Sequence, residues 1–472
     1  MNKYKKLVSN TAILSLGTLA SKVLVYLLLP LYTLCLSPEE YSVADLITQT
    51  ANLLLPILAV GMVDGIFRFA MDKGNREDKA KVFCVSIYTL LLGSIASLIL
   101  YPVLSSIDLF GSYGWLILLY VFASNLHQAC AHFLRGCGNT ILFSVQGIIA
   151  TALTIALNLV FLLVFDMGIL GYVLATVISD LLLALFLFLI KSLWKNLKPS
   201  NFDRTIAKNM IKYSLPMIPT TIFWWVTNVA DRYMISYSIG QEENGLYAIA
   251  FKIPTLLILV SGIFSEAWQY SAVTDSDSDS EGSFFSNVFG SFQGMIFICA
   301  SGLIIFAKIF SRLLFAETYY EAWKYMPVLI FATVFSSLVT FMSSVYVKNK
   351  RSINSFLTAM IGAASNVILN LLLIPLWGAQ GAAIATLSCY VLVYIIRAID
   401  TQRFIKFKTY PIRIILNSIV IFVQCAAILL EVKYWVAIEI ISLFSVTAIN
   451  FKFFFTMFNA VLGGFLRKLR KK

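Results

Sequence analysis

Charged residues stand within, or at the ends of, long apolar stretches of this sequence. The basic ones are Lys22, Arg68, Arg135, Arg232 and Lys252, and the acidic ones considered with them are Asp64 and Asp231. A charge in the middle of a lipid bilayer costs about 3 kcal/mol, so it usually lines an aqueous cavity or pairs with another charge. Excess positive charge in such a cavity suits an anionic ligand, above all a phosphate or pyrophosphate. The five basic residues are therefore predicted to bind substrate, and the two acidic ones to carry a coupling ion or pair with a charge.

Three of the basic residues are expected to meet in the outer half of a central cavity, namely Lys22, Arg232 and Lys252. A rise of 1.5 Å per residue puts Lys252 about 10 Å below the outer membrane edge. Asp231 precedes Arg232 directly, and adjacent residues on a helix do not face each other. The alternative left open is that Asp231 pairs with Lys22 or Lys252 across helices, simply to neutralise charge.

Arg68, Arg135 and Asp64 are expected at the cytoplasmic mouth of the same cavity. Both arginines lie close to water, so their side chains could instead extend along apolar surface to the membrane edge. That alternative also stays open. Asp180 lies inside another apolar stretch, and nothing in the sequence assigns it a role.

The sequence predicts no catalytic residue, no metal ligand and no bound cofactor. His127 and His132 flank Cys130, but their spacing turns them about 140° apart on a helix, which is poor geometry for one metal, so polar lining or packing is expected. The phosphate-binding pattern G-x-x-x-x-G-K-[ST] is missing, which excludes nucleotide hydrolysis through a P-loop. Any uphill transport is expected to use a proton or sodium gradient, with Asp231 or Asp64 carrying the ion.

The composition indicates that these residues are positioned by membrane-spanning helices. Hydrophobic residues make up 59% of the chain and charged residues 13%, and the mean hydropathy is +0.84. Stretches of about 20 apolar residues are long enough to cross a bilayer, and inside lipid they must be helical. About fourteen such stretches are expected, at 9–36, 42–69, 82–106, 113–134, 140–165, 169–190, 213–239, 245–270, 284–307, 325–347, 352–376, 378–396, 414–430 and 435–460.

The excess of basic over acidic residues is interpreted as an indication of how the helices are oriented in the membrane. The net charge is +12, with 36 Lys and Arg residues. If the N-terminus is cytoplasmic, the few of these residues on the outer side are Lys308, Arg312, Lys324 and Lys433. The positive-inside rule then predicts that both termini are cytoplasmic, and nucleic-acid binding is not expected.

The acidic stretch TDSDSDSEGS, Thr274–Ser283, resembles the opening of a calcium-binding loop. Its sixth position is Ser280 where such a loop needs Gly, and its twelfth is Ser286 where it needs Glu. A solvated cytoplasmic loop is therefore predicted.

Two phrases of the form G-x-x-G-x-x-x-A-T point to an internal duplication: GILGYVLAT, Gly168–Thr176, and GAQGAAIAT, Gly378–Thr386. An even number of spans separates them, so corresponding helices cross in the same direction and the halves are related by an axis along the membrane normal. The glycines are expected to allow close helix packing. Two weaker similarities between the halves are PEEYSVADL with QEENGLYAI, and FAS at Phe122 with FAT at Phe331.

The predicted fold is an all-α polytopic membrane protein with two pseudo-symmetric six-helix bundles and two additional helices. The N-terminal bundle is expected over 1–195, a cytoplasmic linker over 196–209, the C-terminal bundle over 210–400, and two helices with a basic tail over 401–472. Rocking of one bundle against the other would open the cavity to each side in turn, which is alternating access.

Several segments resemble one known family. NTAILSLGTLASKVLVYLLLPLYTLCLSPEEYSVADL, GMVDGIFRFA, FLRGCGNT and DRYMISYSIGQEENGLYAIAFKI resemble, in this order, segments of polysaccharide-transport proteins, the O-antigen and capsule repeat-unit flippases. These belong to the multidrug/oligosaccharidyl-lipid/polysaccharide (MOP) exporter superfamily. The resemblance covers most of the first 400 residues. Departures are the loop at 275–281, and Ser42 at a turn where Gly is usual.

The resemblance implies transport of a polyprenyl-pyrophosphate-linked oligosaccharide from the inner to the outer leaflet of the cytoplasmic (inner) membrane. The pyrophosphate and sugars would occupy the basic cavity while the isoprenoid tail stays in membrane lipid. Lys22, Arg68, Arg135, Arg232 and Lys252 are the matching basic positions. A polysaccharide polymerase and assembly proteins are the implied partners.

Three other function classes are alternatives to this one. A multidrug exporter of the same superfamily would favour an acidic cavity, whereas the residues here are mostly basic. A membrane-embedded sugar polymerase or glycosyltransferase would need acid, base or metal groups, typically on a large loop, and the longest connection, 191–212, lacks His and Cys. A purely structural membrane protein would not need charges at mid-membrane.

Overall fold

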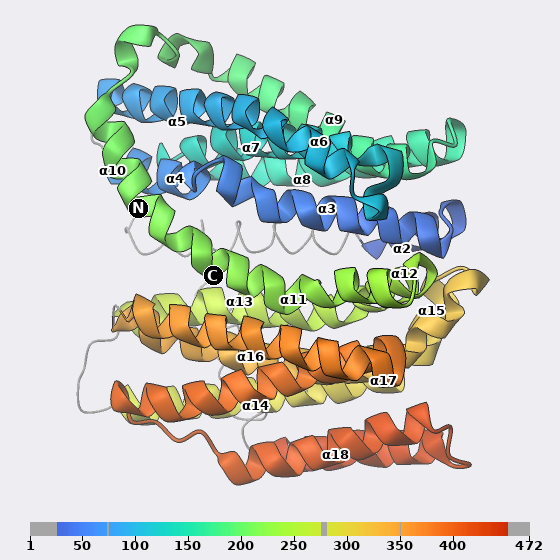
Figure 1. Cartoon of the computed structure of the whole chain (residues 1–472). Coiled ribbons are helices and arrows are strands. Elements are labelled where there is room, and N and C mark those ends of the chain that lie inside the picture. Colours follow the sequence, from blue (N-terminus) through green and yellow to red (C-terminus); the bar gives the residue numbers. More distant parts are fainter. Residues whose placement is uncertain (1–25, 73–74, 275–280, 350, 452–472) are drawn as a thin grey trace, which may run out of the picture. The chain divides into compact units, whose positions relative to one another are not determined.

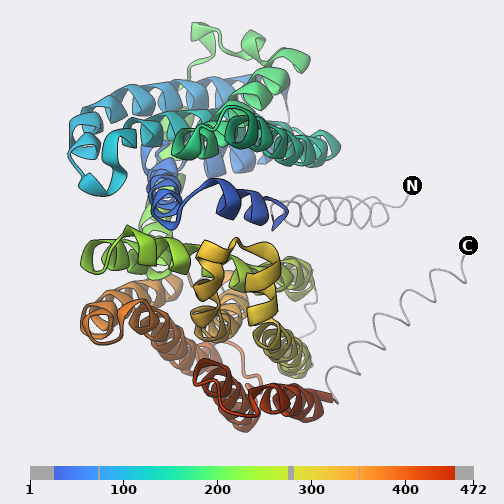
Figure 2. The same cartoon turned by 90° about the vertical axis from the view of Figure 1, so that its right-hand side faces the viewer.

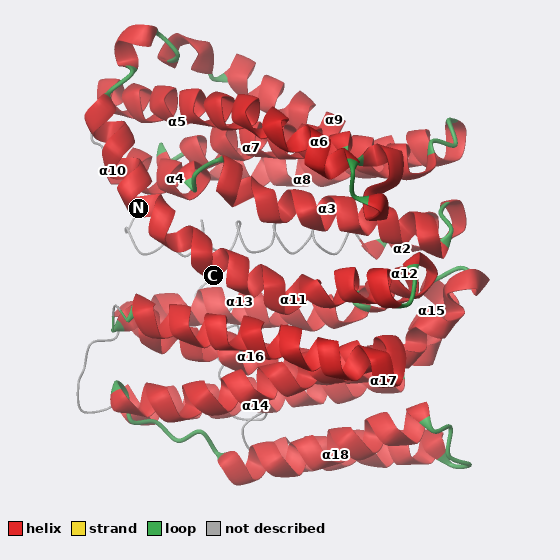
Figure 3. Ribbon diagram, in the orientation of Figure 1, coloured by secondary structure: helices red, strands yellow, loops and turns green. Residues whose placement is uncertain are grey.

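A computed structural model describes residues 26–72, 75–274, 281–349 and 351–451 of the chain. Within these ranges the regular structure is helical, without a strand (Figure 3). The chain divides into two compact units. Unit 1 extends to Trp225 and includes Ile239–Gly245, whereas unit 2 consists of Val226–Ser238 and the chain from Leu246 onward.

Unit 1 is built from helices that pack side by side, and α7 contacts α3, α4, α5, α8 and α9 (Figure 1). They are α2 (Leu28–Cys35), α3 (Pro38–Leu58), α4 (Met62–Asp72), α5 (Arg76–Ser97), α6 (Tyr101–Ser105), α7 (Trp115–Gly136), α8 (Thr140–Asn158), α9 (Gly168–Ile190) and α10 (Arg204–Ser214). The start of α3 is fixed by a capping box, in which the Ser37 hydroxyl accepts from the Glu40 backbone N–H and the Glu40 carboxylate accepts from that of Ser37. A bend of 48° separates α3 from α4, where Val60 and Gly61 adopt positive φ.

Unit 2 contains most of the second half of the chain. Its helices are the last part of α11 (Ile218–Ser238), the second half of α12 (Gln241–Ala250), α13 (Lys252–Thr274), α14 (Glu281–Ile305), α15 (Ala307–Leu314), α16 (Met326–Lys348), α17 (Ser352–Asp400), α18 (Pro411–Leu429) and a final helix, Trp435–Phe451. The long helix α17 is broken at Gly378, where φ is 61° and ψ is −146°. It therefore holds two of the expected spans.

The expected membrane spans agree with the observed helices. In the described ranges, nine helices are long and apolar enough to cross a membrane, or ten if the bent pair α3–α4 is one span. Each expected span from 42–69 onward coincides with a helical segment, the last being described as far as Phe451. The first span, at 9–36, lies largely outside the described residues, as does the acidic loop at 275–280. The all-α polytopic membrane fold is confirmed.

The duplicated phrase has the same local structure in both places. Gly168 and Gly378 take positive φ, 53° and 61°, immediately before a long apolar helix. The second glycine of each phrase allows close packing, because a Cβ on Gly381 would lie 2.2 Å from the Leu373 carbonyl oxygen and one on Gly171 would meet neighbouring side chains at 3.0–3.2 Å. Close packing does not explain Gly168, where a Cβ would meet a single atom at 3.6 Å. Glycine is needed at this position because the backbone has a positive φ, which only glycine adopts without strain.

PEEYSVADL and QEENGLYAI, the weakly similar segments of the two halves, contact each other within unit 1. The Ser42 hydroxyl, near the start of α3, donates to Gln241 Oε1 at 2.5 Å and accepts from Asn244 Nδ2 at 2.7 Å, both in the first turn of α12. A Cβ on Gly245 would lie 1.9 Å from the Pro38 carbonyl oxygen. The starts of two equivalent helices therefore pack backbone against backbone.

The last two helices attach to unit 2 through buried polar contacts. Asn417 of α18 and Asn450 of the final helix exchange amide hydrogen bonds at 2.9 and 3.3 Å, and the two helices lie side by side (red in Figures 1 and 2). Gln424 Nε2 donates to Glu439 Oε2 at 2.5 Å and to the Ser301 carbonyl of α14 at 3.0 Å. Such contacts hold helices together in lipid, where apolar burial gives no preference for a protein neighbour.

Candidate functional site

Asp231 is the centre of a buried polar cluster in unit 2. Its side chain is fully buried on α11, and Oδ2 accepts from the Tyr247 hydroxyl at 2.6 Å and from Thr386 Oγ1 at 3.4 Å. The backbone N–H of Arg232 donates to Oδ1 at 2.9 Å. The carboxylate is therefore held by donors from α11, α12 and the second half of α17.

Two asparagines of α17 extend this cluster. Asn366 Nδ2 donates to Thr386 Oγ1 at 3.3 Å, and Asn370 Nδ2 donates to Asn366 Oδ1 at 3.0 Å. Both asparagines are fully buried, and Asn370 Oδ1 has no hydrogen-bond partner among the described residues. The break at Gly378 separates the helix segment with the asparagines from the segment with Thr386. The cluster thus combines one carboxylate with amide and hydroxyl oxygens at a broken helix, an arrangement that suits a small cation.

Two of the predicted basic residues lie close to this cluster along the chain. Arg232 is 5% exposed, and its guanidinium carbon lies 5.2 Å from the centre of the Phe251 ring. Lys252 follows Phe251 directly and is half-buried. The structure therefore brings Arg232 to Phe251, the residue between α12 and α13, and Lys252 is the first residue of α13.

The other described residues of the predicted site belong to unit 1. Arg68 is exposed on α4 and pairs with Asp72, Nε to Oδ2 at 3.2 Å. Arg135, in the last turn of α7, lies over the rings of Phe67 and Phe143, at 4.7 and 5.0 Å.

The ends of α4 and α7 meet closely, because a Cβ on Gly136 would lie 3.0 Å from the Phe67 carbonyl oxygen. Arg135 and the part of α4 with Arg68 are thus neighbours, and Asp64 is exposed on the same helix. Lys22 lies outside the described residues. The four described basic residues consequently form two groups, one in each unit.

Asn366, Asn370 and Thr386 are not among the residues predicted from the sequence. A signal for them was present, because two amides four residues apart in an apolar run share one face of a helix. Thr386 closes the second copy of the duplicated phrase. Its hydrogen bond to Asp231 depends on packing between α11 and α17, which no local pattern reveals.

A second polar cluster, in unit 1, was also missed. His127 Nδ1 lies 2.8 Å from Asp180 Oδ1, and His127 Nε2 lies 2.6 Å from Gln146 Oε1. The sequence predicts packing or polar lining for His127 and His132 and assigns Asp180 no role. His132 packs edge-on against Phe143, with ring centres 5.9 Å apart.

Arg397 is a further buried charge that the sequence did not single out. It is fully buried on α17, and its guanidinium donates to Thr358 Oγ1 at 2.8 and 3.0 Å and to the Val339 carbonyl at 3.0 Å. These bonds tie both halves of α17 to α16, which is a structural role.

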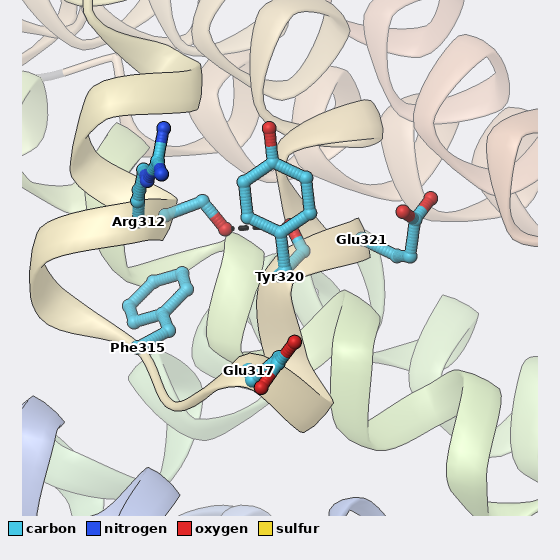
Figure 4. A pocket seen from close by; sticks show the side chains of 6 residues that line it. Arg312, Phe315, Glu317, Tyr320 and Glu321 are labelled. Carbon is cyan, nitrogen blue, oxygen red and sulfur yellow. Dashed lines mark hydrogen bonds between the residues drawn. The ribbon is translucent and has the colours of Figure 1, made fainter.

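Two cavities of unit 2 lie apart from the predicted residues. One, of about 590 Å³, is lined by Arg312, Glu317, Tyr320 and Glu321 beside α15, where Ser311 Oγ donates to the Tyr320 carbonyl at 2.6 Å (Figure 4). The other, of about 530 Å³, is apolar and lies between α16, α17 and α18.

The sequence matches the family described as "Polysaccharide biosynthesis protein" over residues 7–269. A curated relative, an uncharacterized membrane protein of Methanocaldococcus jannaschii, is 24% identical over 412 residues, covering 83% of this chain and 97% of the relative.

Two solved structures share the fold. The lipid II flippase MurJ, in an inward closed conformation, has a TM-score of 0.67 at 16% identity and covers 96% of this chain and 99% of its own. An inward-facing multidrug resistance MATE family transporter of the MOP superfamily has a TM-score of 0.68 at 14% identity, covering 81% and 95%. The family match spans more than half of the 472 residues, so this multi-pass membrane protein belongs to the polysaccharide biosynthesis protein family and has the fold of MOP-superfamily transporters.

Proposed function

We propose that this protein is a lipid-linked oligosaccharide flippase of the cytoplasmic membrane. It moves polyprenyl-pyrophosphate-linked repeat units from the inner to the outer leaflet for export of a surface polysaccharide such as O-antigen, capsule or exopolysaccharide. The observation that carries the proposal is Arg232, a guanidinium 5% exposed on a helix of a transporter fold, within the segment that matches the family. A buried membrane cation is costly and is usually retained for a ligand.

The chemistry of the substrate fits the two basic groups. A pyrophosphate offers several anionic oxygens, and a guanidinium binds two of them at once whereas an ammonium group acts as a point charge. Arg232 with Lys252 in unit 2 would bind the headgroup, and Arg68 with Arg135 would form a separate anion-binding group in unit 1, while the isoprenoid tail remains in membrane lipid. Likeness to the lipid II flippase supports this class of substrate. A polysaccharide polymerase and assembly proteins are the proposed partners.

The proposal is tested with Arg232→Ala, Lys252→Ala and the charge-preserving Arg232→Lys in the native host. We expect both alanine variants to abolish surface polysaccharide at an unchanged protein level. Arg232→Lys should restore part of the export, because it keeps the charge and loses the forked donor geometry. Arg312→Ala, outside the predicted site, is the matched control. Normal polysaccharide from both alanine variants would contradict the proposal.

Deletion of the gene separates the proposed flippase from an enzyme. A flippase deletion leaves complete lipid-linked repeat units in the inner leaflet, whereas loss of a glycosyltransferase leaves unlinked precursors. A multidrug exporter, the alternative with the same fold, would instead leave polysaccharide normal and increase sensitivity to organic cations.

We further propose that Asp231 binds the coupling ion, a proton or sodium, together with Thr386, Asn366 and Asn370. Their buried oxygens lie around a broken helix, where transporters commonly bind coupling ions. Thermal stability of the purified protein should rise when sodium replaces choline, and Asp231→Asn should remove this response. If the ion is a proton, stability should change with pH rather than with sodium, and this change should be smaller in Asp231→Asn than in the wild type. If the thermal stability of Asp231→Asn responds to sodium and to pH as that of the wild type does, Asp231 is not the ion ligand.

A further inference from the structure

A cluster of polar side chains in unit 1 joins three membrane helices and has no part in the proposed headgroup or cation sites. Asp180 of α9 accepts from the Ser124 hydroxyl of α7 through Oδ2 and lies 2.8 Å from His127 Nδ1 through Oδ1. The other ring nitrogen of His127 lies 2.6 Å from Gln146 Oε1 of α8. Both members of the ion pair are largely buried, with 11% and 16% of their side chains exposed.

The cluster lies near the middle of the membrane. His127 is 12 residues beyond the start of α7 at Trp115, and Asp180 is 12 residues beyond the start of α9 at Gly168. At 1.5 Å per residue both lie about 18 Å from the N-terminal ends of their helices, and a hydrocarbon core is about 30 Å thick. Ionisable residues at this depth are rare and are commonly parts of proton pathways.

The contacts of the His127 ring accommodate two protonation states. A neutral imidazole carries one N–H and an imidazolium carries two. With Asp180 Oδ1 at one nitrogen and Gln146 Oε1 at the other, both acceptors are satisfied by an imidazolium paired with a carboxylate. After loss of one proton, a half-turn of the Gln146 amide presents its NH₂ group to the bare nitrogen. The ring therefore gains or loses a proton without losing a hydrogen bond.

The duplication provides an internal comparison. His127 lies five residues after Phe122 in the repeated Phe-Ala-Ser/Thr phrase, and Ser336 has the same place after Phe331. Asp180 lies twelve residues after Gly168, and Tyr390 has the same place after Gly378.

In unit 2 the equivalent Ser336 lies on α16, and the Tyr390 hydroxyl of α17 donates to Asn228 Oδ1 of α11 at 2.6 Å. α16 packs against α17 as α7 packs against α9, although neither serine nor tyrosine changes its charge near neutral pH. Joining the two helices therefore does not require titratable groups, yet unit 1 has them.

We propose that His127 and Asp180 form a proton-binding site of unit 1, and that this site carries a proton through the transport cycle. The second statement rests on the proposed flippase function, whereas the first does not. Binding changes a neutral imidazole beside a carboxylate into an imidazolium beside a carboxylate, with no bond other than N–H formed. The site is separate from Asp231, which belongs to unit 2.

Other ionisable groups act on this site from the surrounding helices. On α7, the Tyr120 hydroxyl interacts electrostatically with Asp180, and His132 interacts with His127. Asp64 of α4 and Arg135 of α7 act on His132. Because His132 is a second histidine beside the site, the test must remove its signal.

The test uses the fact that the chain has two histidines. Full-length protein without a histidine tag, carrying His132→Gln and ¹⁵N-labelled histidine, is placed in lipid nanodiscs and followed by imidazole ¹⁵N NMR between pH 5 and 9. We expect His127 to change from imidazolium to neutral imidazole within this range. Asp180→Asn keeps the shape of the side chain and a hydrogen-bonding oxygen but removes the charge. In this variant the imidazolium of His127 should form only at a proton concentration at least tenfold higher. Asp166→Asn, an exposed residue before α9, is the matched control and should leave the titration unchanged.

One protonation state throughout the range, or the same titration in Asp180→Asn, would overturn the proton-binding site. Its coupling role is tested by surface polysaccharide export at external pH 5.5 to 8. Export should depend on pH in the wild type and lose that dependence in Asp180→Asn. Equal dependence in both would overturn coupling. If gene deletion leaves polysaccharide normal, the flippase proposal fails while the NMR result still decides whether the site binds a proton.

Discussion

The Lys308 ammonium group forms an ion pair with the Glu431 carboxylate, which lies in the turn after α18. The same ammonium lies over the rings of Trp323 and Trp435, at 4.2 and 4.7 Å. One side chain of α15 therefore connects the neighbouring 3-10 helix, Glu317–Lys324, with the start of the final helix. The hydrogen bond and charge of Lys308 lower the pKa of Glu431.

This ion pair predicts a pH-dependent stability. Because the pKa of Glu431 is lower in the folded than in the unfolded chain, its contribution is fully present above the ordinary glutamate pKa of about 4.3. It is lost as the pH falls through the lower folded value. Glu431→Gln should therefore lower the Tm slightly at pH 7, the effect being small because the carboxylate is exposed.

The difference in Tm between Glu431→Gln and the wild type should disappear in acid. Glu321→Gln, which removes an exposed pair with Lys324 inside one short helix, is the control and should have a smaller effect at pH 7. A Tm difference for Glu431→Gln that stays constant from pH 7 to pH 3 would contradict the assignment.

The sequence could identify buried charges but not their partners. Arg232 and Asp231 were recognisable because charge is conspicuous in an apolar run, and both are buried as that argument requires. Arg68, by contrast, is exposed and paired with Asp72, one turn away. The partners of Asp231 come from helices that are distant along the chain, and helix rotation in a bundle depends on packing that a single sequence does not encode locally.

Among the helices, length and position were predictable and breaks were not. An apolar run of about 20 residues specifies a span by itself. The bend after α3 and the π-helical turn at Leu159–Val164, by contrast, interrupt runs that remain apolar. The break in α17 was the exception, because the duplicated phrase marked Gly378 as a counterpart of Gly168.

The glycines of the second phrase should be sensitive to substitution for different reasons. Gly381→Ala places a Cβ 2.2 Å from the Leu373 carbonyl oxygen, so the backbone on either side of the break must separate. Gly378→Ala puts a Cβ on a residue with φ of 61° and ψ of −146°, a conformation that costs an L-residue about 1–3 kcal/mol. Both variants should lower the Tm, Gly381→Ala more strongly.

The control for these variants is Gly302→Ala in α14, where a Cβ would meet nothing within 4 Å. It should leave the Tm unchanged or raise it, because alanine has a higher helix propensity than glycine. If Gly381→Ala is as stable as the wild type in the same experiment, the two segments of α17 on either side of the break are not held in close contact.

For the complete chain, the distribution of charge predicts both termini on the cytoplasmic side. This orientation is tested by labelling intact cells with a membrane-impermeant maleimide, after replacing the reactive native cysteines. Lys433→Cys, in the exposed turn after α18, should be labelled from outside. Ser200→Cys, exposed in the connection before α10, should be labelled only after permeabilisation. The reverse pattern would invert the topology and move Arg68 and Arg135 to the outer mouth.

The assignment of α10 and Ile239–Gly245 to unit 1 has a consequence for gene fragments. A polypeptide that stops in the connection at 196–203 would lack both segments, including the Gln241 and Asn244 side chains that bind Ser42. Such a fragment would be an incomplete product, degraded when made alone. It would be rescued when the remainder of the chain is synthesised in the same cell, as in reassembly of a split protein.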